Sequence, residues 1–285
     1  MNRYEDIYQF WDRIKEANIP TGYYKTSSNV LKIRIHNFLF GNVMWYNVEA
    51  TGQTQRRDHT LGKLVLFDID GTLIRNTQAH KIAFSSGFKQ VYGISASIDS
   101  INHHGLTDQQ IIKEVLSKHG LKEKVIEEKI KECMEAMVNS FRGAIKTEEI
   151  YLLPGVKPLL ETLHKMGLLL GLVTGNLQEI AEGKLRKASI YHYFKVGGFG
   201  SDAPQRATML KIAIDRASKI IGKIQPQDVF LFGDTIYDVM AGKQVGVNTI
   251  AVATGSYSEE MLKDADIVVS SLEDTQSIVN IITRT

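Results

Sequence analysis

Cysteine is almost missing from this sequence, since Cys133 is the only one in 285 residues. A single thiol excludes an internal disulfide and any metal cluster that needs several cysteines, a usage that fits a reducing compartment. We therefore expect a cytoplasmic protein. Cys133 falls on an apolar helical pattern, so we interpret it as a core residue.

Long apolar runs are missing as well. No stretch approaches the roughly 20 apolar residues that a membrane-spanning helix needs. The first residues, MNRYEDIYQFWDR, carry acidic side chains early and lack the apolar centre of a signal peptide. We expect a soluble chain without a membrane partner.

Neither sign of charge is in excess. The chain has 34 Lys and Arg against 32 Asp and Glu, a net charge of +2, with no dense basic block. This balance offers no electrostatic reason to expect a nucleic-acid partner, while a small anionic substrate fits it. With 43% hydrophobic and 23% charged residues, the chain has the composition of a folded globular protein of one large or two modest domains.

Short apolar runs and amphipathic stretches alternate from residue 64 onward. This alternation is typical of an α/β fold, and we predict a Rossmann-like parallel sheet with helices on both faces. The predicted strands are residues 64–67, 168–173, 195–198, 229–232, 249–252 and 267–269.

A long helical stretch separates the first two predicted strands. Within it, apolar residues recur at spacings of three and four, which indicates a buried helix face: Ile126, Ile130, Cys133, Met134, Met137, Val138 and Phe141. Pro154 and Gly155 then interrupt the chain before it returns to the core. We therefore predict a helical cap at residues 78–151, inserted after the first strand of a core formed by residues 63–77 and 152–285.

The first 62 residues follow a different pattern. Residues 4–14 form a short helical stripe, LKIRIHNF alternates like a strand, and EATGQTQRRDHTLGK has the composition of a polar linker. Three roles stay open for this N-terminal extension: an element that packs on the core, an arm that binds a partner, or extra sequence from an upstream start codon.

The stretch LVLFDIDGTLI raises the central chemical question, because a buried apolar strand ends in Asp68 and Asp70. Two carboxylates this close repel each other and resist burial unless a cation lies beside them or one is protonated. The pair therefore suggests a metal site.

Polar side chains follow three further strands. Thr174, Gly175 and Asn176 follow the second strand, Arg206 lies beyond the third, and Asp234 and Asp238 follow the fourth. In open parallel sheets, ligands bind beyond the carboxyl ends of the strands, so these groups should meet at one edge. Carboxylates, a hydroxyl, backbone amides and a guanidinium together suit Mg²⁺ and a phosphate group, and Asp68, Asp70, Asp234 and Asp238 are the candidate metal ligands.

From about residue 62 to the C-terminus, the motifs DIDGT, VTGN, SDAPQR and GDTIYD resemble those of the haloacid dehalogenase superfamily, and most closely its phosphoglycolate-phosphatase-like members. The resemblance implies that Asp68 is the nucleophile that forms an aspartyl-phosphate and that Asp70 is the general acid and then base. It also implies that Thr174 and the following amides hold the phosphoryl oxygens. Asp234 would complete the Mg²⁺ site, with Asp238 as a ligand or a neighbour that supports one.

The third motif departs from the family pattern, which usually has a lysine there. Arg206 and Lys211 are the two candidates. We favour Arg206, because Ser201 or Asp202 could cap a helix that Pro204 helps to start, which would place Arg206 in its first turn. A plain surface salt bridge is the competing interpretation of Arg206.

Within this family, an aspartate at position 70 favours phosphate-ester chemistry, so we predict a Mg²⁺-dependent phosphatase that hydrolyses a small phosphate monoester. Two alternatives stay open: a sugar-phosphate mutase of the same family, and a non-catalytic interaction module. A helical cap leaves limited volume above the sheet edge, so a small phosphorylated metabolite is the expected partner. His103 and His104 are interpreted as cap-loop residues near that substrate rather than as metal ligands.

Overall fold

The structure is a computed structural model that describes residues 62–75 and 77–284, together with the backbone of four strands earlier in the chain. It divides into two compact units, residues 1–61 with 165–168 and residues 62–164 with 169–285. The four early strands form an antiparallel sheet in sequence order: β1 (Thr21–Lys25), β2 (Val30–Asn37), β3 (Asn42–Glu49) and β4 (Thr54–Gln55).

These strands bear on the predictions for the N-terminal extension. The strand predicted from LKIRIHNF is confirmed as β2. The segment interpreted as a polar linker contains β4, so that interpretation is wrong for residues 54–55. The helical stripe predicted at residues 4–14 lies outside the described residues.

The larger unit contains a six-stranded sheet, and each predicted strand is confirmed to within one residue at either end. The order is β10-β9-β8-β5-β6-β7, and every neighbouring pair is parallel. The strands are β5 (Leu64–Phe67), β6 (Leu169–Thr174), β7 (Val196–Phe199), β8 (Val229–Gly233), β9 (Asn248–Val252) and β10 (Ile267–Val269).

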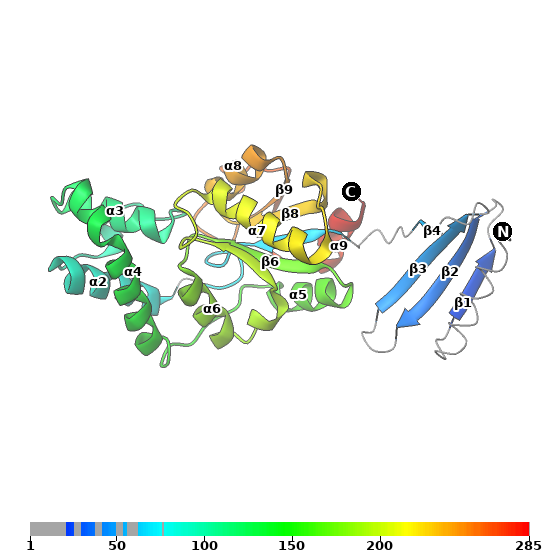
Figure 1. Cartoon of the computed structure of the whole chain (residues 1–285), viewed down its shortest axis with the longest axis horizontal. Helices are drawn as coiled ribbons and strands as arrows, with labels where there is room; N and C mark the ends of the chain where they lie inside the picture. The colour runs from blue at the N-terminus through cyan, green and yellow to red at the C-terminus, as the bar shows by residue number, and fades with distance from the viewer. Residues whose placement is uncertain are drawn as a thin grey trace. The chain divides into compact units, whose positions relative to one another are not determined.

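Helices cover both faces of this sheet, as predicted (Figure 1). Helix α7 packs with Leu64, Leu66 and Leu231 in one apolar cluster, and α5 and α6 lie on the opposite side from α7 and α8. The helices of the core are α5 (Val156–Lys165), α6 (Gln178–Lys187), α7 (Arg206–Ile221), α8 (Ile236–Val245) and α9 (Thr275–Arg284), with short 3-10 turns at Tyr191–Tyr193 and Pro226–Asp228.

Strand β5 lies between β6 and β8 and is completely buried, which explains its unbroken apolar sequence. At its carboxyl end, the ring of Phe67 stacks on Phe232 of β8 with 4.8 Å between the ring centroids. The amide of Asp68 donates to the carbonyl of Phe232 over 2.8 Å. These contacts hold the ends of β5 and β8, and therefore the aspartates that follow them, in a fixed relation.

Three helices and a short 3-10 turn form the cap between β5 and α5: α2 (Gln78–Tyr92), η1 (Ile98–Ser100), α3 (Asp108–Lys118) and α4 (Glu123–Ala144). The apolar stripe predicted from the sequence lies inside the cap on α4, and Cys133 is buried there. Gly87 lets α2 approach α4 closely, because a Cβ at this position would lie 2.8 Å from Met137. The inserted helical cap is thus confirmed, while its boundaries stay a prediction.

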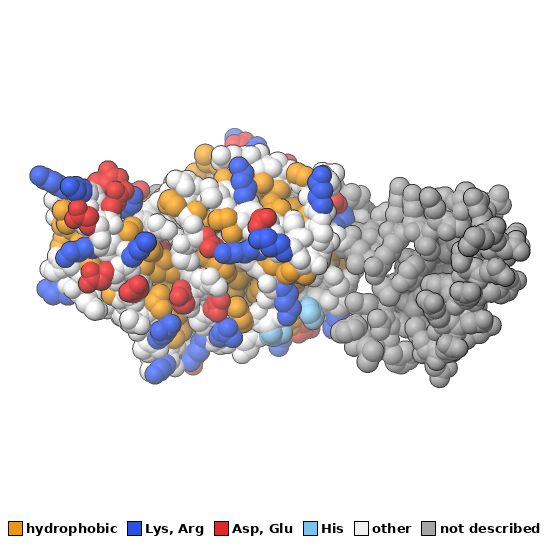
Figure 2. Space-filling model, in the orientation of Figure 1, with side chains coloured by type: hydrophobic (Ala, Val, Ile, Leu, Met, Phe, Trp, Pro, Cys, Tyr) orange, Lys and Arg blue, Asp and Glu red, His pale blue; other side chains and the backbone are white. Residues whose placement is uncertain are grey.

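No helix in the described part of the chain is long and apolar enough to cross a membrane. Figure 2 shows basic and acidic side chains interspersed over the visible face of the larger unit. The predictions of a cytoplasmic location and of no nucleic-acid partner stay predictions.

Candidate active site

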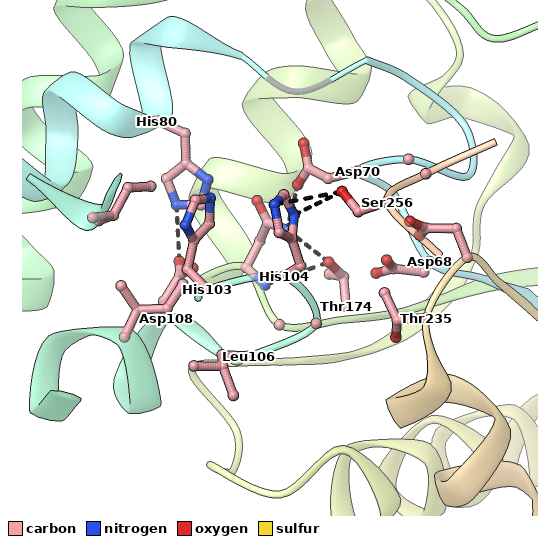
Figure 3. Close-up of a pocket in the computed structure, with 18 of the residues that line it drawn as sticks. Asp68, Asp70, His80, His103, His104, Leu106, Asp108, Thr174, Thr235 and Ser256 are labelled. Atoms are coloured by element: carbon pink, nitrogen blue, oxygen red, sulfur yellow. Dashed lines mark hydrogen bonds and ion pairs between the residues drawn. The ribbon is translucent and has the colours of Figure 1, made fainter. Parts of the chain in front are cut away.

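A cavity of about 110 Å³ lies between the cap and the carboxyl ends of the central strands. It is lined by most of the residues that the sequence singled out: Asp68, Asp70, Thr174, Gly175, Asn176, Arg206 and Asp234. The cap contributes His80, His103 and His104 to the same cavity, and Ser256 comes from the loop after β9 (Figure 3). The structure therefore brings four separate motifs and the cap together at one site.

Three buried carboxylates form the acidic centre of this site. Oxygens of Asp68, Asp234 and Asp238 all lie within 4.8 Å of one another. Gly71 and Gly255 make room for Asp234, because a Cβ at either position would overlap its carboxylate. The backbone is thus built closely around the Asp234 side chain.

Burial and mutual repulsion perturb these carboxylates strongly. Burial, followed by the charges of Asp238 and Asp70, raises the pKa of Asp68 to about 7, although Arg206 opposes the shift. Burial and the charges of Asp68 and Asp238 raise the pKa of Asp234 to about 8. Such shifts show that the cluster lacks sufficient positive charge from the protein alone.

The donor set fits a hard divalent cation. Carboxylate oxygens are the ligands that Mg²⁺ prefers, and Asp68 and Asp234 have the burial and spacing for it. The carboxylate of Asp70 is not a member of this group, which is defined among the described residues, because it faces Lys184 instead. Its role as a ligand stays a prediction without support from the position of the side chain.

Arg206 is the cation that the cluster does contain. It is the first residue of α7, and its Nη1 lies 2.7 Å from Asp238 and 3.3 Å from Asp68. Burial would lower the pKa of Arg206, but Asp238 and Asp68 outweigh burial and raise it. Its buried Nε has no hydrogen-bond partner among the described residues, and Arg206 is one of the residues that line the cavity.

The other candidate for the third motif, Lys211, lies exposed on α7. Although Arg206 is in the first turn as expected, the predicted cap of this helix is wrong. The N-cap is Gln205, which makes no side-chain capping bond. Asp202 instead accepts from the amide of Phe199 and from both terminal nitrogens of Arg216. Its carboxylate is therefore used in an ion pair with Arg216 rather than in a helix cap.

Asp238 supports Arg206 from α8. Its Oδ1 accepts from Arg206, and its Oδ2 accepts from the Thr235 hydroxyl at 2.6 Å in the capping box that starts α8. Both oxygens therefore have protein partners. Because Asp238 also belongs to the described group that could hold a metal, both of its predicted roles, ligand and supporting neighbour, stay predictions.

Thr174 is the last residue of β6, and Gly175 and Asn176 form the turn after it. The Thr174 hydroxyl oxygen accepts from Asn176 Nδ2 at 2.7 Å, so its own O–H is available to donate to an anion. Gly175 lies against the cap, since its carbonyl accepts from the amide of Asp108 and a Cβ would meet the backbone of Leu106 at 2.8 Å. This turn therefore joins the phosphate-binding candidates to the cap.

Lys184 is a member of the site that sequence reasoning missed. It lies on α6, is 0% exposed, and contacts Asp70 at 2.6 Å. A signal was available, because Leu177, Ile180 and Ala181 form a buried stripe and Lys184 falls on the same helix face. A lysine on a buried face needs an acidic partner, and Asp70 is that partner.

His103 and His104, predicted to be near the substrate, line the cavity as a stacked pair with 4.7 Å between ring centroids (Figure 3). His104 lies within hydrogen-bond distance, 3.1 Å, of the Ser256 hydroxyl. Burial, followed by His104, lowers the pKa of His103, so its imidazole is neutral near pH 7. Neither histidine belongs to the described group that could hold a metal.

Fold and site together define an α/β enzyme of the Rossmann-like class, with an acidic centre at the sheet edge and an inserted helical cap. Residues 65–252 match the family model described as haloacid dehalogenase-like hydrolase. That match spans more than half of the chain, which therefore belongs to the haloacid dehalogenase-like hydrolases.

Two curated relatives illustrate the similarity. The chain is 26% identical to the pyrophosphatase PpaX of Halalkalibacterium halodurans, over 77% of this chain and 98% of the relative. It is 23% identical to a phosphoglycolate phosphatase of Salmonella paratyphi A, over 74% of this chain and 89% of the relative. These matches confirm the predicted family and the predicted class of enzyme, a haloacid dehalogenase-like phosphatase.

Solved structures agree on the fold. A hydrolase from Pseudomonas syringae has a TM-score of 0.59 at 20% identity, with 77% of this chain and 99% of that chain covered. The protein CbbY from Rhodobacter sphaeroides, solved in complex with phosphate, has a TM-score of 0.54 at 20% identity, with 74% and 95% covered. At these identities the likeness shows the shared fold alone.

Proposed function

We propose that this protein is a Mg²⁺-dependent phosphatase that hydrolyses a small phosphate monoester through an aspartyl-phosphate on Asp68. The observation that carries this proposal is the buried group of Asp68, Asp234 and Asp238 with Arg206 beside it. A nucleophilic carboxylate, an acidic centre that needs a cation and a fixed guanidinium are the parts that phosphoryl transfer requires.

Asp68 and Asp234 are the residues that would hold Mg²⁺. When bound, the ion would supply positive charge that keeps both carboxylates ionised and offsets the negative charge of the phosphoryl group. The raised pKa values of Asp68 and Asp234 support this assignment, because burial and mutual repulsion disfavour the ionised carboxylates when no such charge is present.

In the first half of the proposed reaction, a carboxylate oxygen of Asp68 attacks phosphorus and the bond from phosphorus to the ester oxygen breaks. Asp70, whose pKa Lys184 lowers in the free chain, takes up the proton of a monoanionic ester and gives it to the leaving oxygen, which departs as an alcohol. The Arg206 guanidinium and the Thr174 hydroxyl hold the phosphoryl oxygens, a role supported by their place in the lining of the cavity and by the 3.3 Å between Arg206 and Asp68.

In the second half, Asp70 is a carboxylate and accepts a proton from water. The water oxygen attacks phosphorus, the bond to Asp68 breaks, and inorganic phosphate leaves with Asp68 restored. The cap covers this edge of the sheet, and the cavity of about 110 Å³ supports a small substrate such as a phosphorylated metabolite.

The test is phosphate release by the purified full chain. Phosphoglycolate, pyrophosphate and a panel of sugar phosphates would be offered with Mg²⁺ and with chelator. We expect release that depends on Mg²⁺, and a phosphorylated Asp68 that reduction with borohydride marks for mass spectrometry.

Two results would overturn the proposal. Isomerised sugar phosphate without net phosphate release would identify the mutase alternative. An active parent whose Asp68→Asn variant keeps near-parent turnover would exclude the aspartyl-phosphate.

A further inference from the structure

A completely buried lysine lies beside the proposed acid–base residue. The Nζ atom of Lys184 is 2.6 Å and 2.8 Å from the two oxygens of Asp70, 2.7 Å from Oδ1 of Asn176 and 3.1 Å from Nδ1 of His80. An ammonium group has three N–H donors, and here three residues accept from it. Every N–H donor of Lys184 is therefore used, and these hydrogen bonds fix the position of its ammonium group.

These contacts define the orientation of His80, which lies on cap helix α2. An ammonium can only donate, so Nδ1 of His80 accepts and Nε2 carries the ring hydrogen. Nε2 lies 3.1 Å from Oδ2 of Asp108 on cap helix α3 (Figure 3). The ring of His80 also stacks on Phe84 at 4.9 Å, which restricts its rotation.

Asp108 is in turn fastened to the core. Its Oδ2 accepts from the amide of Leu177 at 2.8 Å, and its own amide donates to the carbonyl of Gly175 at 2.9 Å. One network of hydrogen bonds therefore runs from the turn after β6, through two cap helices, to Lys184 and Asp70. All of its hydrogen bonds can form only when the cap lies on the core as it does in this structure.

We propose that Lys184 is a positioning residue for Asp70, and that His80 and Asp108 make this positioning depend on the seating of the cap. The inference rests on the proposed function, because it assigns to Asp70 the proton transfers described above. Lys184 holds the carboxylate of Asp70 at the edge of the cavity, and the cap residues hold Lys184. The competing explanation is that the ion pair between Lys184 and Asp70 only stabilises the fold. A buried ion pair is weak evidence for such a role, because a well-packed apolar replacement is often neutral or stabilising.

The test uses two esters that depend differently on Asp70. The leaving group of p-nitrophenyl phosphate departs without a proton, whereas that of glycerol 2-phosphate needs one. In Lys184→Met, we expect a rapid burst of nitrophenolate close to one equivalent, followed by slow turnover, because a displaced Asp70 cannot activate water. With glycerol 2-phosphate, we expect kcat to fall by about tenfold to a hundredfold with little change in KM.

Three further variants separate positioning from packing. His80→Leu removes an acceptor for Lys184, whereas His80→Asn places an oxygen near the position of Nδ1. We therefore expect His80→Leu to show the burst and slow turnover, and His80→Asn to turn over without a burst, as the parent does. These variants also test the proposal if Lys184→Met fails to fold. Lys187→Met, at an exposed lysine of the same helix, should match the parent on both esters.

The outcomes distinguish the two proposals. Folded Lys184→Met or His80→Leu that matches the parent on both esters overturns the role of Lys184 and the cap. So does a uniform loss on both esters in which KM rises and no burst appears. A parent chain that releases phosphate from neither ester overturns the proposed function itself.

Discussion

Arg206 donates from Nη1 to Oδ1 of Asp238 over a distance of 2.7 Å. The same nitrogen lies 3.3 Å from Asp68, and both side chains of the Arg206–Asp238 pair are at least nine-tenths buried. Asp238, on α8, therefore holds a guanidinium from α7 beside the carboxylate that follows β5. A fixed positive charge at this point can stabilise negative charge on a transferring phosphoryl group without reorganising.

Substitution of Arg206 tests this arrangement. Arg206→Ala should lower kcat/KM by about 10²-fold to 10³-fold, the scale of a lost preorganised electrostatic group. Arg206→Lys should keep partial activity, because it retains the charge but loses the planar fork. Lys211→Ala should behave as the parent, since Lys211 is exposed on the same helix. Kinetics of the three variants on one phosphate ester would check this order, and an inactive Lys211→Ala beside a normal Arg206→Ala would reverse the assignment.

The nucleophile should be separable from the fold. Asp68→Asn should reduce turnover by at least about 10³-fold, because an amide oxygen is a poor phosphoryl acceptor. It should also raise the free energy of unfolding of the metal-free protein at neutral pH, by something of the order of 1 kcal/mol, since it removes a buried charge from a repelling cluster. Urea unfolding and phosphate release would be measured on the same preparation. A destabilised Asp68→Asn variant would show that Arg206 already neutralises the cluster.

Divalent cation should stabilise the protein more as the pH rises. Asp68 and Asp234 have folded pKa values raised from 3.8 to about 7 and about 8. Between these limits the folded chain binds more protons than the unfolded chain, so the stability of the metal-free protein falls as the pH increases. Burial would raise the pKa of Asp70, but the charge of Lys184 outweighs burial and lowers it, so Asp70 acts in the opposite direction, only in the acidic range below its ordinary pKa.

Because Mg²⁺ competes with those protons, the rise in Tm on adding Mg²⁺ should be larger near pH 8 than near pH 5. Thermal unfolding with chelator and with saturating Mg²⁺ would measure it. An increment independent of pH would argue against a cation bound by Asp68 and Asp234.

Gly255 should be required for the acidic centre. A Cβ there would overlap Oδ2 of Asp234, so Gly255→Ala should displace that carboxylate and weaken Mg²⁺-dependent turnover by about tenfold or more. Gly143→Ala is a matched control near the end of α4, where a Cβ meets nothing within 4 Å. The Mg²⁺ concentration at half-maximal activity would check this. Equal values for both variants would contradict the prediction that a Cβ at residue 255 displaces Asp234.

Local patterns were sufficient for the sheet and for most of the candidate site. The run Leu64–Phe67 is buried on both faces, so its sequence is apolar throughout and can be recognised without a partner strand. Asp68 and Asp234 directly follow such runs and Thr174 ends one, and parallel strands bring their carboxyl ends to one edge. For these residues, the order of strands and polar groups along the chain was enough to predict that they meet.

Only the tertiary structure decided how the charges pair. Lys184 falls on the buried face of α6, but its partner, Asp70, is 114 residues away along the chain, and the pair forms only because α6 packs beside the end of β5. Ser201 or Asp202 was predicted to cap α7, yet Asp202 pairs with Arg216, which lies 14 residues away on that helix. The sequence by itself determined which segments form strands, because burial leaves an apolar pattern in a short window. The choice of partner for a long charged side chain depends on distances between segments far apart in the chain, which only the packed structure sets.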